Sequence, residues 1–293
     1  MRSSAFTCRR LSCRAETDAD PGEFRVCGLH NAWNHSQEAE PSKGHCVRKI
    51  LSVIGFLACL SLPSLALAAC EEIRQEASSY LACSFEPARE EIRLHLAGPE
   101  GQAYGGFAKL RQQLWAERRV LLFAMNAGMY HDDLSPVGYF AEYGKVLKPV
   151  VTGGGWGNFH LLPNGVFLMK DGKAEVMETK AFVASGVVPD FGTQSGPMLV
   201  IDGKLHPRFL ADSDSFKIRN GVGVDSKGHV HMVVSRVPVR FYDFAAFFRD
   251  RLGCDNALYL DGTISSVFNA EDKRMDRLFP MGPILSVSMP IPQ

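Results

Sequence analysis

A carboxylate followed by small hydroxyl side chains lies near the C-terminal end of the sequence. The stretch NALYLDGTISSVF covers residues 256–268, and its apolar run ends at Leu260, directly before Asp261 and Gly262. A turn between two strands is one interpretation, because Asp-Gly is a common turn pair. An active-site loop is the other, with Asp261 as the catalytic carboxylate and Ser265 as a hydroxyl that contacts the substrate.

Two basic side chains could bind the phosphate of a substrate. Arg219 stands directly before the strand sequence NGVGVD, and a guanidinium matches phosphate oxygens bidentately. His160 follows the glycine-rich stretch TGGGWGN, whose backbone amides can approach an anion and whose Trp156 could stack on a sugar face. The alternatives are a surface salt bridge for Arg219, and a flexible loop with a core tryptophan for the glycine-rich stretch.

Amide side chains mark two further strand ends. Asn126 ends the apolar run RRVLLFAMN, where its amide could bind a ligand hydroxyl or could cap its own loop. Gln194 precedes a Gly-Pro bend in FGTQSGPMLV, where a buried amide needs several partners and also suits a structural network. Ser195 beside it lacks a Gly-x-Ser-x-Gly context, so the sequence does not support a hydrolase nucleophile there.

Divalent metal binding has weaker support in the sequence. His131, Asp132 and Asp133 lie together in one loop and could act as ligands. His229 and His231 would share one strand face, because side chains repeat every two residues, but no third ligand is near in sequence. We therefore assign no metal ligands and keep a divalent cation as an alternative.

Hairpins and two amphipathic helices must position these side chains. Turn signals at residues 171–172, 202–203 and 225–228 each separate two strand-like runs. Residues 104–119 and 242–254 carry apolar side chains at helical spacing, and each segment leads into an apolar strand run. The pattern predicts a single α+β domain of largely antiparallel mixed sheets with a few inserted helices.

The first 69 residues differ in character from the rest. Residues 1–47 hold four of the eight cysteines without a zinc-like pair, and indicate a disordered or non-native extension. Residues 48–69 have a basic start, an apolar centre and an Ala-x-Ala site, which is the layout of a secretory signal peptide rather than a membrane span. Residues 70–293 are then the mature domain, periplasmic or secreted, with no stable membrane span after cleavage.

Three cysteines remain in the mature domain. Cys70 and Cys83 could face one another across a hairpin and form a disulfide, which an oxidising compartment permits. Alternatively, the sequence before Cys70 resembles a lipoprotein box, and Cys70 would carry the lipid anchor. Cys254 is predicted to be a buried thiol.

Five stretches occur in the order found in one protein family. NAGMY, GNFHLLPNGVF, TQSGPMLVIDGKLHPRF, KIRNGVGVD and NALYLDGTISSVF together resemble the phosphodiester glycosidase family, including its bacterial envelope members. The resemblance extends over roughly residues 70–290. This sequence departs from the family motifs at Asn220, which replaces a threonine, and at Ala127, Thr263 and Ile264, which replace glycines.

The resemblance implies a mixed α/β domain that cleaves a sugar-1-phosphodiester into a free sugar and a phosphomonoester. Asp261 would act as base or nucleophile, or would stabilise the oxocarbenium-like charge, while Arg219 and His160 would hold the phosphate. The sugar would be bound by Asn126, Gln194, Ser265 and Trp156.

Two other functions fit the same sequence. One is a non-catalytic envelope module that binds glycans or phosphorylated polymers, and the other is a metal-dependent phosphodiesterase. In each case the partner is a phosphorylated sugar or an envelope polymer. The formal net charge is zero, so no global basic field indicates a nucleic-acid partner.

Overall fold

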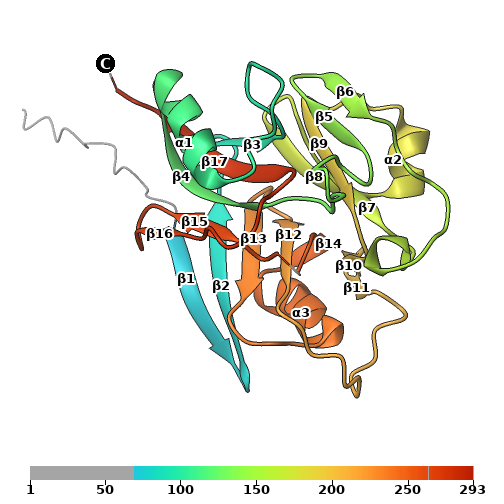
Figure 1. Cartoon of the computed structure of the whole chain (residues 1–293). Helices are drawn as coiled ribbons and strands as arrows, with labels where there is room; N and C mark the ends of the chain where they lie inside the picture. The colour runs from blue at the N-terminus through green and yellow to red at the C-terminus, as the bar shows by residue number, and fades with distance from the viewer. Residues whose placement is uncertain (1–68, 263, 293) are drawn as a thin grey trace, which may run out of the picture. The chain divides into compact units, whose positions relative to one another are not determined.

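Three antiparallel sheets make up most of the computed structural model, which describes residues 69–262 and 264–292 (Figure 1). Their strand orders are β1-β2-β13-β12-β14-β10-β11, β16-β15-β4-β17-β3 and β6-β5-β9-β7-β8. Every strand pairing among the described residues is antiparallel. The predicted α+β class is therefore confirmed.

The strands of the seven-stranded sheet are β1 (Ala69–Gln75), β2 (Ser78–Phe85), β10 (Met198–Ile201), β11 (Lys204–Leu205), β12 (Asn220–Asp225), β13 (Val230–Ser235) and β14 (Cys254–Tyr259). One five-stranded sheet contains β3 (Glu91–His95), β4 (Arg119–Asn126), β15 (Val267–Asn269), β16 (Arg274–Met275) and β17 (Ile284–Pro290). The other contains β5 (Phe140–Glu142), β6 (Lys145–Lys148), β7 (Gly165–Lys170), β8 (Lys173–Glu178) and β9 (Phe191–Ser195).

Short Asp-Gly turns form two of the predicted hairpins. Asp171 and Gly172 have φ of 49° and 72°, and Asp202 and Gly203 have φ of 47° and 72°. Two successive left-handed residues are the requirement of the tight turn whose twist matches antiparallel strands. The turns join β7 to β8 and β10 to β11, and the third predicted hairpin joins β12 to β13.

Few helices interrupt the sheets. They are α1 (Phe107–Ala116), α2 (Thr179–Ser185), α3 (Phe241–Ala246) with a π-helical turn that continues it (Phe247–Arg251), and a single 3-10 turn (Asn158–His160). Figure 1 shows α1 lying over β4 and β17, and its buried stripe of Phe107, Leu110 and Leu114 packs in one apolar cluster with Ile284. The helix α2 was not predicted, because its seven residues are too short to show a clear period.

One apolar core joins the three sheets. Leu81 and Leu258 of the seven-stranded sheet, Phe123 of β4 and Phe167 of β7 belong to the same buried cluster. Each sheet therefore contributes side chains to this shared cluster, and smaller buried clusters pack the seven-stranded sheet against α3 and the sheet of β5 and β7 against α2. None of the helices among the described residues is long and apolar enough to cross a membrane.

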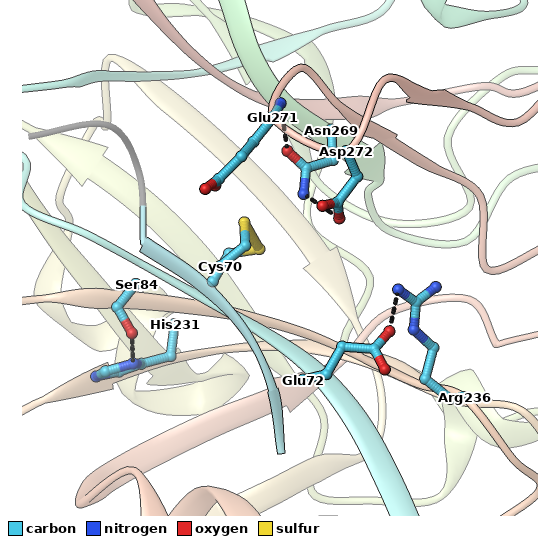
Figure 2. The surroundings of a disulfide bond; sticks show 9 residues. Cys70, Glu72, Ser84, His231, Arg236, Asn269, Glu271 and Asp272 are labelled. Carbon is cyan, nitrogen blue, oxygen red and sulfur yellow. Dashed lines mark hydrogen bonds and ion pairs between the residues drawn. A yellow bond between two sulfur atoms is a disulfide. The ribbon is translucent and has the colours of Figure 1, made fainter. Parts of the chain in front are cut away.

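The predicted disulfide is present at the start of the described chain. Cys70 and Cys83 face one another across β1 and β2 and are bonded, with Cα atoms 4.1 Å apart (Figure 2). A sulfur engaged in a disulfide cannot also carry a lipid, so the structure favours the disulfide over lipid attachment at Cys70. Cys254 is a buried free thiol, as predicted. The extension at 1–47 and the signal peptide at 48–69 lie outside the described residues except for Ala69, so both remain predictions.

Candidate functional site

Strand ends from all three sheets meet around Asp261. β4 ends at Asn126, β12 begins at Asn220, and β14 leads into Leu260 and Asp261. The hydroxyl of Ser195, the last residue of β9, donates to the Leu260 carbonyl oxygen at 3.2 Å. We call this meeting point the Asp261 junction: Asn126, Ser195, Asn220, residues 259–262 and residues 264–266.

The Asn126 side chain connects three segments of the Asp261 junction by hydrogen bonds. Its side chain is fully buried, and its amide nitrogen donates to the Asp261 carbonyl oxygen at 2.8 Å. Its amide oxygen accepts from the Ser266 backbone N–H and from the Asn220 amide, each at 3.0 Å. Asn126 therefore bonds to distant segments, not to its own loop, and it fixes both ends of the loop that carries Asp261.

Gly262 fits its position only because it has no side chain. Its N–H donates to the Tyr259 hydroxyl oxygen at 2.8 Å, and a Cβ atom there would overlap that oxygen and the Ile218 carbonyl. The hydroxyl of Ser265 donates to the Gly262 carbonyl at 2.8 Å, so in this structure it closes its own turn. Asp261 itself is partly exposed. The site therefore presents a partly exposed carboxylate, and the contacts of Gly262 restrict the movement of the backbone that carries it.

Arg219 is buried near Tyr259 of the junction, with 1% of its surface exposed. Its Nε donates to the Val239 carbonyl at 2.9 Å and one Nη to the Ser215 carbonyl at 3.1 Å, while the guanidinium carbon lies 3.5 Å from the centroid of the Phe241 ring. The ion pairs found within residues 69–262 and 264–292 do not include it. The surface salt bridge that the sequence allowed is therefore wrong.

The charges at the junction affect the pKa of two tyrosine hydroxyls. Burial raises the pKa of Tyr259, which the Arg219 charge lowers and the Asp261 charge raises. Burial also raises the pKa of Tyr130 to about 12, with Asp261 adding to the shift. Arg219 and Asp261 thus both act on the Tyr259 hydroxyl. Neither tyrosine stands out in the sequence, because Tyr259 lies inside an apolar run and Tyr130 inside an irregular loop.

Gln194 lies beside the junction but its side chain points into a separate network. Its amide oxygen accepts from the backbone N–H groups of Tyr139 and Val151, both at 3.0 Å. Its amide nitrogen donates to the Val151 carbonyl at 2.7 Å and to the Thr179 hydroxyl at 3.1 Å. All four hydrogen-bonding positions of the amide are occupied by protein atoms. The network holds Val151, which directly precedes the glycine-rich stretch.

The glycine-rich stretch is exposed. Trp156 has 97% of its surface exposed, so the core tryptophan that the sequence allowed is wrong. His160 interacts through Nδ1 with the Gly153 carbonyl at 3.2 Å, which closes the segment on itself. The hydrogen bonds and ion pairs of the described residues do not join Trp156 or His160 to the Asp261 junction.

Three of the possible metal ligands, Asp133, His229 and His231, interact with neighbouring protein groups. The described residues contain no group of three or more His, Cys, Asp or Glu side chains that could hold a metal ion. Asp133 accepts from the backbone N–H and the hydroxyl of Ser135 at 2.9 and 2.6 Å. His229 and His231 both lie against the Asp225 carboxylate, at 3.1 and 3.3 Å.

Comparisons with known proteins point to one family. Residues 120–279 match the phosphodiester glycosidase family model, and this range contains all seven candidate site residues. The chain is 33% identical over 214 residues to the uncharacterized protein YigE of Escherichia coli strain K12, covering 73% of this chain and 84% of YigE.

A solved structure shares the fold. The catalytic domain of zebrafish N-acetylglucosamine-1-phosphodiester alpha-N-acetylglucosaminidase superposes with a TM-score of 0.52 at 14% sequence identity, over 75% of this chain and 81% of the zebrafish chain. At this identity the superposition shows a common fold only. From the family match and the identity to YigE, this chain belongs to the phosphodiester glycosidase family.

Proposed function

We propose that this protein hydrolyses a sugar-1-phosphodiester. Water adds to the anomeric carbon, the bond from that carbon to the phosphate oxygen breaks, and the products are a free sugar and a phosphomonoester. The observation that carries the proposal is a partly exposed Asp261 on a loop hydrogen-bonded at both ends to the buried Asn126, with the buried cation Arg219 near Tyr259 of the same junction. Family membership and the activity in the zebrafish protein's name support the same reaction.

Asp261 is assigned the work at the anomeric carbon. A phosphate leaving group departs without strong general-acid help, so one carboxylate can serve where most glycosidases use two. The carboxylate would act as base or nucleophile, or stabilise the positive charge that develops on the sugar ring. The Asp-Gly sequence keeps it in place, since Gly262 is packed against Tyr259 and Ile218.

Arg219 is assigned a long-range electrostatic role toward the phosphate. Its charge is buried in a medium where electrostatic effects are stronger than in water. Its guanidinium donates to the Val239 and Ser215 carbonyls, so a phosphate oxygen in direct contact would have to accept from another of its five N–H groups. His160, at the end of the glycine-rich stretch, is the more accessible side chain for phosphate contact in this proposal.

The remaining residues act on the sugar in two ways. Asn126, Gln194 and Ser265 have their polar atoms engaged with protein partners, so they would orient the sugar by holding the loops around it. Trp156 is free to stack on a sugar face. The disulfide between Cys70 and Cys83 supports a periplasmic or secreted location, where such bonds persist.

The test is a product assay on the purified protein. A panel of sugar-1-phosphodiesters is offered with and without a chelator, and the products are identified. We expect free sugar and a phosphomonoester in both conditions. Asp261→Asn should lower turnover by at least about 100-fold with unchanged thermal unfolding, while the exposed Asp132→Asn serves as the matched control and stays active.

Each alternative has its own signature in the same assay. Binding without any sugar release would indicate a non-catalytic module. Release of a sugar phosphate, lost on chelation or in Asp132→Asn, would indicate a metal-dependent phosphodiesterase. Full activity of Asp261→Asn would overturn the role assigned to that carboxylate.

A further inference from the structure

A concave site lies between the helix α1 and the strands β15 and β16. Its volume is about 740 Å³, within the range of roughly 300–1,000 Å³ typical of small-molecule sites. We call it the α1 groove. Figure 1 shows α1 and the β15–β16 pair on the same side of the molecule.

The α1 groove is separate from the Asp261 junction. It is lined by residues 119–121, at the start of β4, whereas the junction contains Asn126 at the other end of that strand. A strand rises about 3.3 Å per residue, so Arg119 and Asn126 are roughly 23 Å apart along β4. None of the residues that line the groove belongs to the junction, so a ligand in the groove would not occupy the proposed catalytic site.

The face of the helix α1 that lines the groove differs from the face that packs into the core. Its core stripe is formed by residues 107, 110 and 114, but the groove is lined by Ala108, Arg111, Gln112 and Trp115. The spacing of these four residues is that of one continuous helix face. Trp115 has 65% of its surface exposed, which is a large apolar surface to leave in water for a residue outside the core.

The floor of the groove is apolar. Leu121 of β4 and Phe268 of β15 are both nearly fully buried, and Met275 of β16 packs against the same cluster. Ala108 is small and leaves the space above them open. The groove thus offers an apolar base with an aromatic wall, which suits a ring or a short alkyl chain.

The charged residues that line the groove are all cations. Its lining contains Arg111, Arg119, Lys273 and Arg274 but no Asp or Glu. Arg119 and Arg274 each pair with a carboxylate outside the lining, whereas Arg111 and Lys273 are exposed and take no part in the ion pairs of the described chain. One terminal nitrogen of Arg274, Nη1, is buried without a hydrogen-bond partner.

We propose that the α1 groove binds a small amphipathic anion, an alkyl chain or ring that carries a phosphate or carboxylate head. The apolar floor takes the body, and Arg111 and Lys273 hold the head from the rim. Residues 1–68 do not suit the groove, because they contain eight Lys and Arg against six Asp and Glu and so carry a net positive charge like its lining. The proposal is independent of the hydrolase activity proposed above.

Calorimetric titration of the full chain tests this. Octyl phosphate and octanoate, below their micelle concentrations, represent the two head groups, with inorganic phosphate and neutral octyl glucoside as comparators. We expect one site for an octyl anion, with inorganic phosphate and octyl glucoside each binding about 10-fold more weakly or worse. The double variant Arg111→Gln, Lys273→Gln should weaken anion binding by about 10-fold.

Two variants keep the test specific. Ala108→Phe should fill the groove and block binding, and Lys109→Gln, a cation on the same helix that does not line the groove, should change nothing. Unchanged affinity in the double variant would overturn the proposal, as would octyl glucoside binding as tightly as octyl phosphate. Self-association that is lost in Trp115→Ala would identify a second copy as the occupant and would also overturn it.

Discussion

The Asp261 loop, described at residues 261–262 and 264–266, and the glycine-rich stretch of residues 152–160 differ in how the fold holds them. The first is tied to Asn126 at both ends and packed against Tyr259. The second bonds mainly to itself, and Trp156 at its tip is almost fully exposed. Both have the same sequence pattern, in which polar or glycine residues lie next to a strand.

The difference suggests a division of labour. A group that reacts must be held in position before the substrate arrives, because every reorganisation at that moment adds to the barrier. A group that recognises a ligand can remain mobile and be ordered by binding. We therefore assign chemistry to the tied loop and recognition to the exposed one, and the variants below separate the two.

The largest effect on stability is expected from Asn126→Ala. The change leaves the Asn220 amide, the Ser266 N–H and the Asp261 carbonyl without their buried partner. Several unsatisfied polar groups should lower the free energy of unfolding by about 3 kcal/mol, measured by urea denaturation. Turnover should also fall, because the loop of Asp261 loses its anchor.

Asn158→Ala is the matched control from the exposed stretch. The Asn158 side chain is exposed at the start of the 3-10 turn, so its loss should leave the unfolding midpoint unchanged. Equal destabilisation by the two substitutions would contradict the contrast between the loops.

The two loops should also differ in how well they tolerate an added methyl group. Gly262→Ala places a Cβ against the Tyr259 hydroxyl and the Ile218 carbonyl, and this overpacking should cost about 2 kcal/mol. Gly154→Ala places the same group in open space, without a left-handed φ to strain, and should have no measurable effect. Thermal unfolding of the two proteins makes the comparison, and a stable Gly262→Ala would show that the Asp261 loop can move.

Local sequence signals were sufficient for much of the fold. The three hairpins and the helices around residues 107–116 and 241–251 follow from turn pairs and apolar spacing. Asn126 and Asp261 could be nominated because each ends a strand. That they touch could not be predicted from local pattern, since they are 135 residues apart and meet only when two sheets pack.

Long-range packing also explains what the sequence predictions missed. Arg219 resembles a surface cation in sequence, but α3 and the segment before β12 bury it. Gln194 turns its amide toward Val151 and Thr179 on neighbouring segments, which no local pattern indicates. The α1 groove combines a helix with two later strands, so its four cations are scattered in the sequence.

A smaller effect on stability should depend on pH. It arises at Glu142 of β5, in the sheet that also contains β7 and β9. Burial raises the pKa of Glu142 from 4.5 to about 7, although its carboxylate accepts from the Leu96 N–H. The folded state then binds more protons than the unfolded state between about pH 4.5 and 7, so the free energy of unfolding falls as pH rises through that window. At pH 8, Glu142→Gln should be more stable than the parent by about 1 to 2 kcal/mol, and the difference should vanish near pH 4.

The exposed Glu175→Gln is the control for this measurement and should follow the parent at every pH. A Glu142→Gln protein that gains no stability at pH 8 would show that this carboxylate is solvated well enough to ionise at no cost. The sheet carrying the glycine-rich stretch would then be looser than the packing around Leu96 indicates.

Trp156→Ala should have the smallest effect on the fold and a distinct effect on function. A side chain that is 97% exposed contributes little to stability, so the unfolding midpoint should not move. If the indole stacks on the sugar, its loss should raise KM by about 10-fold, equivalent to roughly 1.4 kcal/mol of binding, with kcat nearly unchanged. Trp156→Phe should recover most of the affinity, because a phenyl ring still offers a flat face. A fall in kcat at constant KM would instead place Trp156 in the chemical step, and the division between a tied catalytic loop and an exposed recognition loop would not hold.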